Sequence, residues 1–353
     1  MNDTFISYLN IPNMGILFGE LINYLDIFDD YHKHFPEKTD LLKEYFKIDK
    51  IYLGFTEYLG DYGSSEEHSY LVNSSTGKSK ITDKEFLKYI QMFNPLFTVL
   101  PFEYVPSDGG KKRVLRCYKK LNTLFEIINE ENVNYKNQNF IIPFYTKHIE
   151  HIPMGDFNNN LEKSKGILVI TEKPEEMNYE LLQKYKKILE KIKCDIKIKA
   201  NLETPFDILL GKEMGCTHIE LNFPTSYSEK GMAMDIDFTS FDKSQSYGKI
   251  EEIEKFNFEL CLLNMSSNTY ETNMDLLTKT CECFVCKTGY KKSYIHHLIK
   301  CKELNGNIIL SIHNIFQAKK LYEVYDSLKD ENERKNFLMW FISKNCCPIK
   351  ENE

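Results

Sequence analysis

Three cysteines within six residues constrain this chain more than any other feature of its sequence. They form the pattern Cys281-Glu-Cys283-Phe-Val-Cys286. Where thiols stay reduced, closely spaced cysteines usually bind a metal ion, and Zn²⁺ takes four tetrahedral ligands, most often thiolate sulfur and imidazole nitrogen. A loop of reduced cysteines without a metal is the alternative, but free thiols at this spacing are reactive. The pattern therefore predicts three ligands of one structural zinc ion.

Three histidines follow the cysteines and compete for the fourth ligand position. His296 and His297 are adjacent, so on a helix their side chains point about 100° apart and at most one faces inward. His313 lies in a stretch whose apolar residues recur at helical spacing. We favour His313 as the fourth ligand, with His296 or His297 as the alternative.

Length and composition indicate an ordinary globular protein. The chain has 353 residues, of which 42% are hydrophobic and 27% charged, so it can bury a large core. No apolar run reaches 18 residues, so we expect no membrane-spanning segment. The first residues lack a basic region and a long apolar core, so we do not expect them to form a signal peptide. Ten scattered cysteines do not form a disulfide framework, which favours a cytoplasmic location.

Strand and helix patterns alternate from Ile51 onward. A hairpin around residues 74–77 and a capping box at Thr82 and Glu85 come first. The later predicted strands are 97–102, 140–144, 166–170, 195–199 and 218–223, and the predicted helices between them are 111–129, 178–192 and 205–214. This alternation predicts a parallel β/α fold, either a (β/α)₈ barrel or a doubly wound sheet. No Gly-x-Gly-x-x-Gly follows a strand, which disfavours dinucleotide binding.

The cysteine pattern, Tyr294-Ile-His296-His297-Leu298 and His313-Asn314 together resemble the zinc-site block of tRNA-guanine transglycosylases. These enzymes exchange guanine for a deazaguanine base at the anticodon wobble position of tRNA. The resemblance extends more weakly over residues 51–316. It implies that zinc is bound by Cys281, Cys283, Cys286 and His313.

The same resemblance implies an α/β fold of a definite kind, a (β/α)₈ TIM barrel with a C-terminal zinc-binding subdomain and docked C-terminal helices. Residues 1–50 are expected to lead into the barrel, and residues 51–260 to form its core. Residues 261–353 would hold the last barrel elements, a zinc subdomain at about 276–316, and a helix from Asn314 to about Ser343.

The positions that carry catalysis in active family members differ in this sequence. Base exchange needs one carboxylate to attack the ribose C1′ and a second to move a proton. By resemblance, Glu220 stands at the nucleophile's position, where the family has aspartate, and Ile51 stands at the second carboxylate's position. Ser226 replaces an arginine, and residues 170–174 replace a base-binding Gly-Gly loop. Glutamate is one methylene longer than aspartate, and a displacement of a reacting group by about 1 Å can lower the rate by on the order of 100-fold. From these four departures together, the sequence predicts no catalytic residues.

A second resemblance fits these departures. Glu220-Leu-Asn-Phe223-Pro224, followed by Glu229-Lys230-Gly231, is similar to the accessory, non-catalytic chain of the heterodimeric eukaryotic queuine tRNA-ribosyltransferase. It implies a catalytic subunit and tRNA as partners. In the wider family, peripheral association with the mitochondrial outer membrane is known, although nothing in this sequence encodes an anchor.

Contact with RNA needs a local basic face, because the net charge of the chain is −7. Lys291 and Lys292, beside the cysteines, are one candidate, and a second is the basic stretch of Lys111, Lys112, Arg113, Arg116, Lys119 and Lys120. Two other functions stay open at this point. One is an active transglycosylase that uses Glu220, and the other is a zinc-containing RNA- or protein-binding module unrelated to base exchange.

Overall fold

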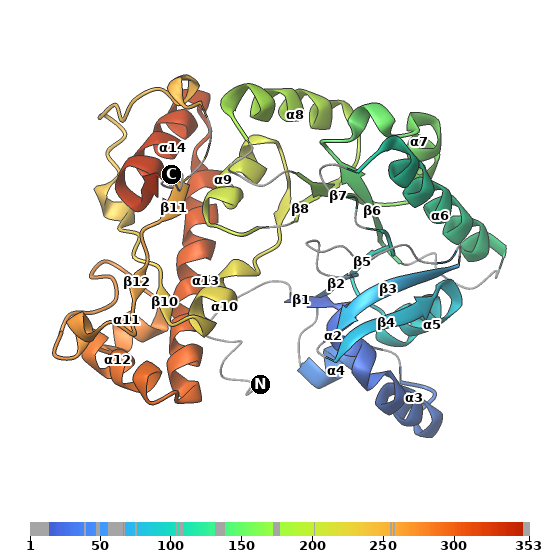
Figure 1. Ribbon diagram of the computed structural model, residues 1–353, viewed down its shortest axis with the longest axis horizontal. Coiled ribbons are helices and arrows are strands. Elements are labelled where there is room, and N and C mark those ends of the chain that lie inside the picture. Colours follow the sequence, from blue (N-terminus) through green and yellow to red (C-terminus); the bar gives the residue numbers. More distant parts are fainter. Residues whose placement is uncertain are drawn as a thin grey trace. The chain divides into compact units, whose positions relative to one another are not determined.

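The computed structural model describes residues 14–38, 40–46, 50–55, 66, 68–74, 76–103, 105, 109–130, 138–171, 177–200, 202–254, 256 and 258–348. The chain divides into two compact units, each containing elements drawn in Figure 1. Among the described residues, unit 1 comprises 14–171 and 193–200, and unit 2 comprises 177–192 and 202–348.

Unit 1 is built on a parallel sheet. Its strands lie side by side in the order β1 (Met14–Leu17), β2 (Ile51–Gly54), β5 (Phe97–Val99), β6 (Phe140–Tyr145), β7 (Gly166–Ile170) and β8 (Ile196–Lys199), and each neighbouring pair is parallel. All side chains of β6 and β7 are buried, as expected for a parallel sheet covered on both faces. This arrangement fits a TIM-like fold (Figure 1) and confirms the predicted parallel β/α class.

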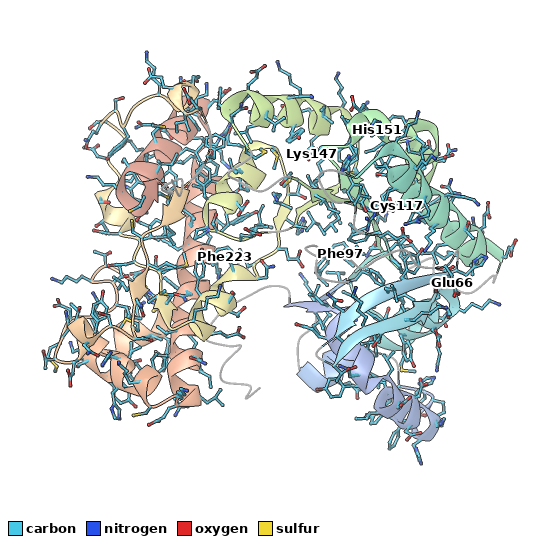
Figure 2. All side chains as sticks on the ribbon, viewed as in Figure 1. Glu66, Phe97, Cys117, Lys147, His151 and Phe223 are labelled. Carbon is cyan, nitrogen blue, oxygen red and sulfur yellow. The ribbon has the colours of Figure 1, made fainter. Side chains whose placement is uncertain are left out.

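Helices and a hairpin complete unit 1. They are α2 (Phe18–Leu21), η1 (Ile22–Tyr24), α3 (Leu25–His34), α4 (Leu41–Phe46), the hairpin β3 (Ser69–Ser74) and β4 (Gly77–Thr82), α5 (Asp83–Phe93), α6 (Lys111–Glu130), η3 (Ile149–His151) and α7 (Met154–Glu162). The capping box of α5 is confirmed, because Thr82 Oγ1 accepts from Glu85 N and Glu85 Oε2 accepts from Thr82 N at 2.8 Å. Cys117 on α6 is fully enclosed in this unit (Figure 2), with its Sγ 3.4 Å from Tyr145 Oη.

One close approach in the sheet requires glycine. A Cβ atom at Gly166 would collide with the backbone carbonyl of Ile196 on the neighbouring strand β8. β7 and β8 therefore pair at this point because residue 166 has no side chain.

Unit 2 contains mostly helices and two short antiparallel pairs. Its elements are α8 (Tyr179–Lys191), α9 (Phe206–Glu213), β9 (His218–Ile219), α10 (Phe223–Glu229), β10 (Met232–Ala233), η5 (Phe238–Ser240), η6 (Ile250–Glu252), β11 (Phe258–Leu260), β12 (Leu263–Asn264), η7 (Asn268–Tyr270), α11 (Phe284–Thr288), α12 (Lys292–Lys300), α13 (Leu304–Ser327), α14 (Glu331–Asn345) and β13 (Cys346–Pro348). β10 pairs with β12, and β11 pairs with β13. The long helix α13 packs against α9, α10, α11 and α12, so it is the central element of this unit.

A buried carboxylate joins three helices of unit 2. Glu213 at the end of α9 is 3% exposed, and its Oε1 accepts hydrogen bonds from Tyr325 Oη at 2.6 Å and Arg334 Nε at 3.1 Å. These contacts attach α13 and α14 to α9. No helix in the described part of the chain has the length and apolarity that a membrane crossing requires.

Three predicted elements differ from the structure. The strand predicted at 97–102 ends at Val99, as β5. The strand predicted at 218–223 is only the two residues of β9, because Pro224 sits in the first turn of α10 and the helix begins at Phe223. The helix predicted from Asn314 onward is divided, because α13 ends at Ser327 and Asp330 caps a new helix, α14. Of the segment 170–174, predicted to replace the family's base-binding loop, residues 172–174 lie outside the described residues.

Candidate metal centre

The three cysteines and His313 converge on one point in unit 2. Their candidate ligand atoms all lie within 4.8 Å of one another. The Sγ atoms of Cys281, Cys283 and Cys286 lie 3.8, 3.4 and 3.6 Å from His313 Nδ1. In a tetrahedral site with Zn–S of about 2.3 Å and Zn–N of about 2.0 Å, a sulfur and a nitrogen ligand are about 3.5 Å apart. The four atoms are thus spaced as the vertices of a zinc tetrahedron.

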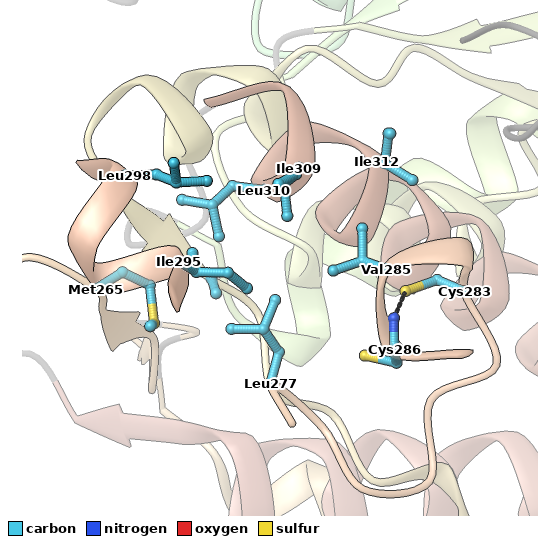
Figure 3. Close-up of a cluster of buried hydrophobic side chains, with 11 residues drawn as sticks. Met265, Leu277, Cys283, Val285, Cys286, Ile295, Leu298, Ile309, Leu310 and Ile312 are labelled. Atoms are coloured by element: carbon cyan, nitrogen blue, oxygen red, sulfur yellow. Dashed lines mark hydrogen bonds between the residues drawn. The ribbon is translucent and has the colours of Figure 1, made fainter. Parts of the chain in front are cut away.

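The cysteine segment folds so that its own amides support the sulfurs. Cys283 is the N-cap of α11, and its Sγ accepts a hydrogen bond from Cys286 N at 3.4 Å (Figure 3). Cys281 Sγ accepts from Cys283 N at 3.5 Å. Gly289 then ends α11 in the left-handed conformation, with φ +87°. N–H donors directed at sulfur favour the thiolate form, which is the form that binds metal.

His313 is oriented by a backbone carbonyl. Its Nε2 donates to the carbonyl oxygen of Met234 at 2.8 Å, which leaves the Nδ1 lone pair directed at the sulfurs. The next residue, Asn314, binds the same segment of the chain. Its Oδ1 accepts a hydrogen bond from Met234 N at 2.9 Å. Its Nδ2 donates to Met232 O at 2.9 Å and to Ser228 Oγ at 3.1 Å. Both His313 and Asn314 are fully buried. His313 and Asn314 therefore both attach α13 to residues 232–234, and the same contacts orient the imidazole ring.

The titration behaviour of the cluster reflects shared negative charge. Burial by itself would lower the pKa of His313, but its hydrogen bonds with Cys281 and Cys286, and their charge, raise this pKa to about 10. Hydrogen bonds from Cys283 and Cys286 hold the pKa of Cys281 far below its usual value. Hydrogen bonds with Cys281 and Cys286 raise the pKa of Cys283. A divalent cation that binds these sulfurs and Nδ1 displaces the shared protons, so metal binding should release protons.

Apolar side chains enclose the sulfurs. Cys283 and Cys286 belong to a buried cluster (Figure 3) with Val285 of α11, Ile295 and Leu298 of α12, Leu310 and Ile312 of α13, and with Met265 and Leu277 of the preceding segment. A site with four protein ligands and no open position is structural, whereas catalytic zinc keeps one position for water or substrate. The arrangement therefore suits a structural zinc ion.

The two alternative histidines point elsewhere. His296 is buried, and its Nδ1 lies 2.8 Å from the carbonyl oxygen of Met265, to which it donates. His297 is exposed and lies beside Cys301, with Nδ1 3.8 Å from the sulfur. Within the described residues, His313 is the histidine that completes the group.

Comparison with known proteins identifies the family. A family model described as queuine tRNA-ribosyltransferase matches residues 55–331, which include all four residues of the cluster. The chain belongs to the queuine tRNA-ribosyltransferase family.

Three relatives illustrate where it falls in the family. The chain is 26% identical to a queuine tRNA-ribosyltransferase-like protein of Plasmodium falciparum, over 97% of this chain and 89% of the relative. It is 23% identical to queuine tRNA-ribosyltransferase accessory subunit 2 of Trichoplax adhaerens, over 81% and 73%. It is 22% identical to accessory subunit 2 of Caenorhabditis elegans, over 77% and 70%.

The two residues predicted to stand at the family's catalytic positions lie at two different strands. Glu220 directly follows β9 and is half-buried, so it occupies the carboxyl end of a strand, where barrel enzymes carry their catalytic residues. Ile51 is the first residue of β2 and is fully buried. The residue that follows the carboxyl end of β2 is Phe55, which is also fully buried. The assignment of Ile51 to the family's second carboxylate stays a prediction, and either end of β2 presents an apolar side chain.

The lysines predicted to contact tRNA begin α12, next to the metal cluster. Lys291 is the N-cap residue of that helix, and Lys292 is its first residue, with Nζ 5.8 Å from the centre of the Tyr270 ring. Both side chains are half-exposed. Contact with tRNA stays a prediction for this family member.

Sequence reasoning missed the partners that orient the zinc ligand. Met234 lies 79 residues before His313, and no local pattern marks it as the acceptor for the ring. The pairing of His313 with Asn314 was the available signal, because two adjacent buried polar residues on one helix both need partners.

Proposed function

We propose that this chain is the non-catalytic accessory subunit of a heterodimeric queuine tRNA-ribosyltransferase. It would support the exchange of guanine for queuine at the wobble position by pairing with the catalytic subunit and helping to hold tRNA. The observation that carries this proposal is a Cys₃His cluster in a family member whose sequence is predicted to have Glu220 and Ile51 at the positions of the family's two catalytic carboxylates. The relatives named accessory subunit 2 support it.

The fold assigned to this subunit is a complete (β/α)₈ barrel with a zinc subdomain at about 276–316 and docked C-terminal helices. Six parallel strands in unit 1 support the barrel. One structural zinc ion would be held by Cys281, Cys283, Cys286 and His313. Its chemistry is to neutralise the thiolates and fasten α11 to α13.

Packing at the carboxyl ends of three strands supports the absence of base-exchange chemistry. Ligands of barrel enzymes bind at this end. Here Phe55 after β2, Phe102 after β5 and Tyr145 at the end of β6 pack together, with ring centres 6.2 Å (Phe55 to Phe102) and 6.5 Å (Phe102 to Tyr145) apart. All three are buried, so side chains fill the space beside these strand ends.

The adjacent carboxylate is also occupied by the protein itself. Glu103 is 7% exposed, and it pairs with Lys120 Nζ at 2.8 Å and with Arg116 Nη2 at 2.6 Å. Each of its two carboxylate oxygens is thus engaged by a cation of the protein itself. Glu103 therefore acts as a structural residue of unit 1.

The surface of the zinc subdomain offers a contact region for partners. Tyr290 and Tyr294 stack with ring centres 5.7 Å apart, and Tyr294 is 46% exposed. Met274, beside Ser293 on the same surface, is 66% exposed. Exposed aromatic and methionine side chains suit a protein interface, and Lys291 with Lys292 next to them suits RNA phosphates. We assign the catalytic subunit and tRNA to this region.

Purification of this chain with a catalytic subunit tests the proposal. The chain alone should not incorporate labelled guanine into tRNA, whereas the pair should incorporate it faster than the catalytic subunit alone. Glu220→Gln in this chain should leave exchange by the pair unchanged. Sustained incorporation by the isolated chain, lost in Glu220→Gln, would instead establish the active transglycosylase. Failure to copurify with any catalytic subunit would favour the unrelated zinc module.

The assembly is proposed to work in the cytoplasm, with peripheral association at the mitochondrial outer membrane as the resemblance implies. None of the ten cysteines forms a disulfide in the structure, which suits a reducing compartment. Cell fractionation with and without the partner subunit tests both locations.

A further inference from the structure

Two cysteines outside the metal cluster lie in contact on a pair of short strands. β11 and β13 are antiparallel, with Leu260 opposite Cys346, and Cys261 N donates to Asn345 O at 2.7 Å. Residue 347 is two positions beyond 345, so Cys261 and Cys347 point to the same face of the pair. Their sulfur atoms are 2.7 Å apart. The two strands thus bring together thiols that are 86 residues apart in sequence.

The contact suits covalent bond formation. The sulfurs are within about 0.7 Å of the length of a disulfide, which is about 2.05 Å. Both residues are exposed, so an oxidant in solution can reach them. Their neighbour Cys346 is less suited, because burial, followed by the charges of Cys261 and Cys347, raises its pKa.

The remaining cysteines lack this combination of exposure and a neighbouring thiol. Cys117 and Cys216 are buried, and burial raises the pKa of Cys194. Cys301 is exposed, but it lies beside the imidazole of His297, 3.8 Å from Nδ1. The other three cysteines belong to the metal cluster.

We propose that Cys261 and Cys347 form a reversible redox modification site whose oxidant is a peroxide. One thiolate attacks the peroxide oxygen of H₂O₂, breaks the O–O bond and becomes a sulfenic acid, and the released hydroxide takes a proton to become water. The second thiol then attacks that sulfur, the S–O bond breaks, and a second water leaves. Two thiols and one H₂O₂ thus give one disulfide and two waters. A low-molecular-weight thiol reverses the bond by exchange.

The bond would enclose the metal cluster. All four cluster residues lie between positions 261 and 347, so the oxidised chain would hold them in one covalent loop. A cross-link of this kind restricts the unfolded chain, and a long loop is restricted most. The site would therefore keep the zinc subdomain and its helices tethered during oxidative stress, when zinc thiolates are vulnerable. This inference is independent of the proposed function.

Peptide mapping of the zinc-loaded full chain tests the site. The chain is treated with hydrogen peroxide, blocked with an alkylating reagent and digested with trypsin without reduction. Cys261 falls in the peptide 256–279, and Cys346 and Cys347 fall in 345–350. We expect these peptides joined, two hydrogen atoms lighter than their sum, and separate again after dithiothreitol. Cys261→Ser and Cys347→Ser should lose the joined peptide, and the matched control Cys346→Ser should keep it.

A second measurement follows the tether itself. After zinc is removed with a chelator, the oxidised wild-type chain should be cleaved more slowly by protease within residues 281–313 than the reduced chain. Cys347→Ser should show no difference between the two treatments, although its zinc content before chelation equals that of the wild type. A joined peptide that persists in Cys347→Ser and disappears in Cys346→Ser would overturn the assignment. So would peroxide treatment that leaves Cys261 fully alkylated while the cluster cysteines oxidise.

Discussion

Asn314→Ala should weaken zinc binding although Asn314 is not a ligand. Its side chain accepts from Met234 N and donates to Met232 O, both at 2.9 Å. Alanine leaves these two backbone groups without partners, at a cost of about 1–3 kcal/mol each, so the free energy of unfolding should fall by about 2–6 kcal/mol. The same strand supplies the carbonyl that orients His313. Loss of such a supporting contact lowers metal affinity by about 10–100-fold.

Two titrations measure these effects. Competition with a chromogenic chelator gives the zinc affinity, and urea unfolding in excess zinc gives the stability. Asn305→Ala is the matched control, since Asn305 is an exposed asparagine at the start of the same helix. It should change the free energy of unfolding by less than about 0.5 kcal/mol. If Asn314→Ala binds zinc as tightly as the wild type, then β10 does not orient His313 and the reasoning fails.

Three further predictions concern other residues. His313→Ala should lose zinc, whereas His296→Ala, which gives up only its bond to the carbonyl of residue 265, should keep it; metal analysis of both proteins decides. Lys120→Met leaves Glu103 with one cation and should lower the free energy of unfolding by about 3 kcal/mol. An unchanged midpoint of urea unfolding would contradict a stabilising ion pair between Lys120 and Glu103. Burial, and next the charge of Lys212, lowers the pKa of His218 from 6.5 in the folded chain. As the pH falls below 6.5, the unfolded chain therefore takes up this proton before the folded chain does, and the free energy of unfolding decreases. His218→Gln should flatten that fall, and equal pH slopes would refute it.

Local patterns were enough to predict the parts of the fold that depend on near neighbours. The capping box at Thr82 uses two residues three positions apart, and the structure has it. The long helix predicted at 111–129 spans 111–130. The helix predicted at 205–214 spans 206–213, and Gly215, which follows its C-cap residue Met214, has φ +84°. Each of these depends on contacts within a few residues, which a sequence displays directly.

Features set by distant contacts were harder to predict. Alternation of apolar and polar residues suggested a strand through Phe223, but tertiary packing begins α10 there, with Pro224 in its first turn. The choice among three histidines was open from spacing alone. His313 is the one whose Nδ1 lies 3.4–3.8 Å from the three sulfurs, and its ring is oriented by Met234, 79 residues earlier in the chain. The site was therefore predictable as a set of ligand types, whereas the contacts that orient the ligands were not.

The order of the metal ligands along the chain has a consequence for biogenesis. The three sulfurs precede the imidazole, which lies 27 residues after Cys286 on a different helix. A chain still emerging from the ribosome would expose the thiols first and could hold an ion only loosely until α13 had been made. Secure zinc capture would thus be a late step of synthesis, and cells short of zinc would accumulate chains with unprotected thiols, which quality-control proteases could recognise.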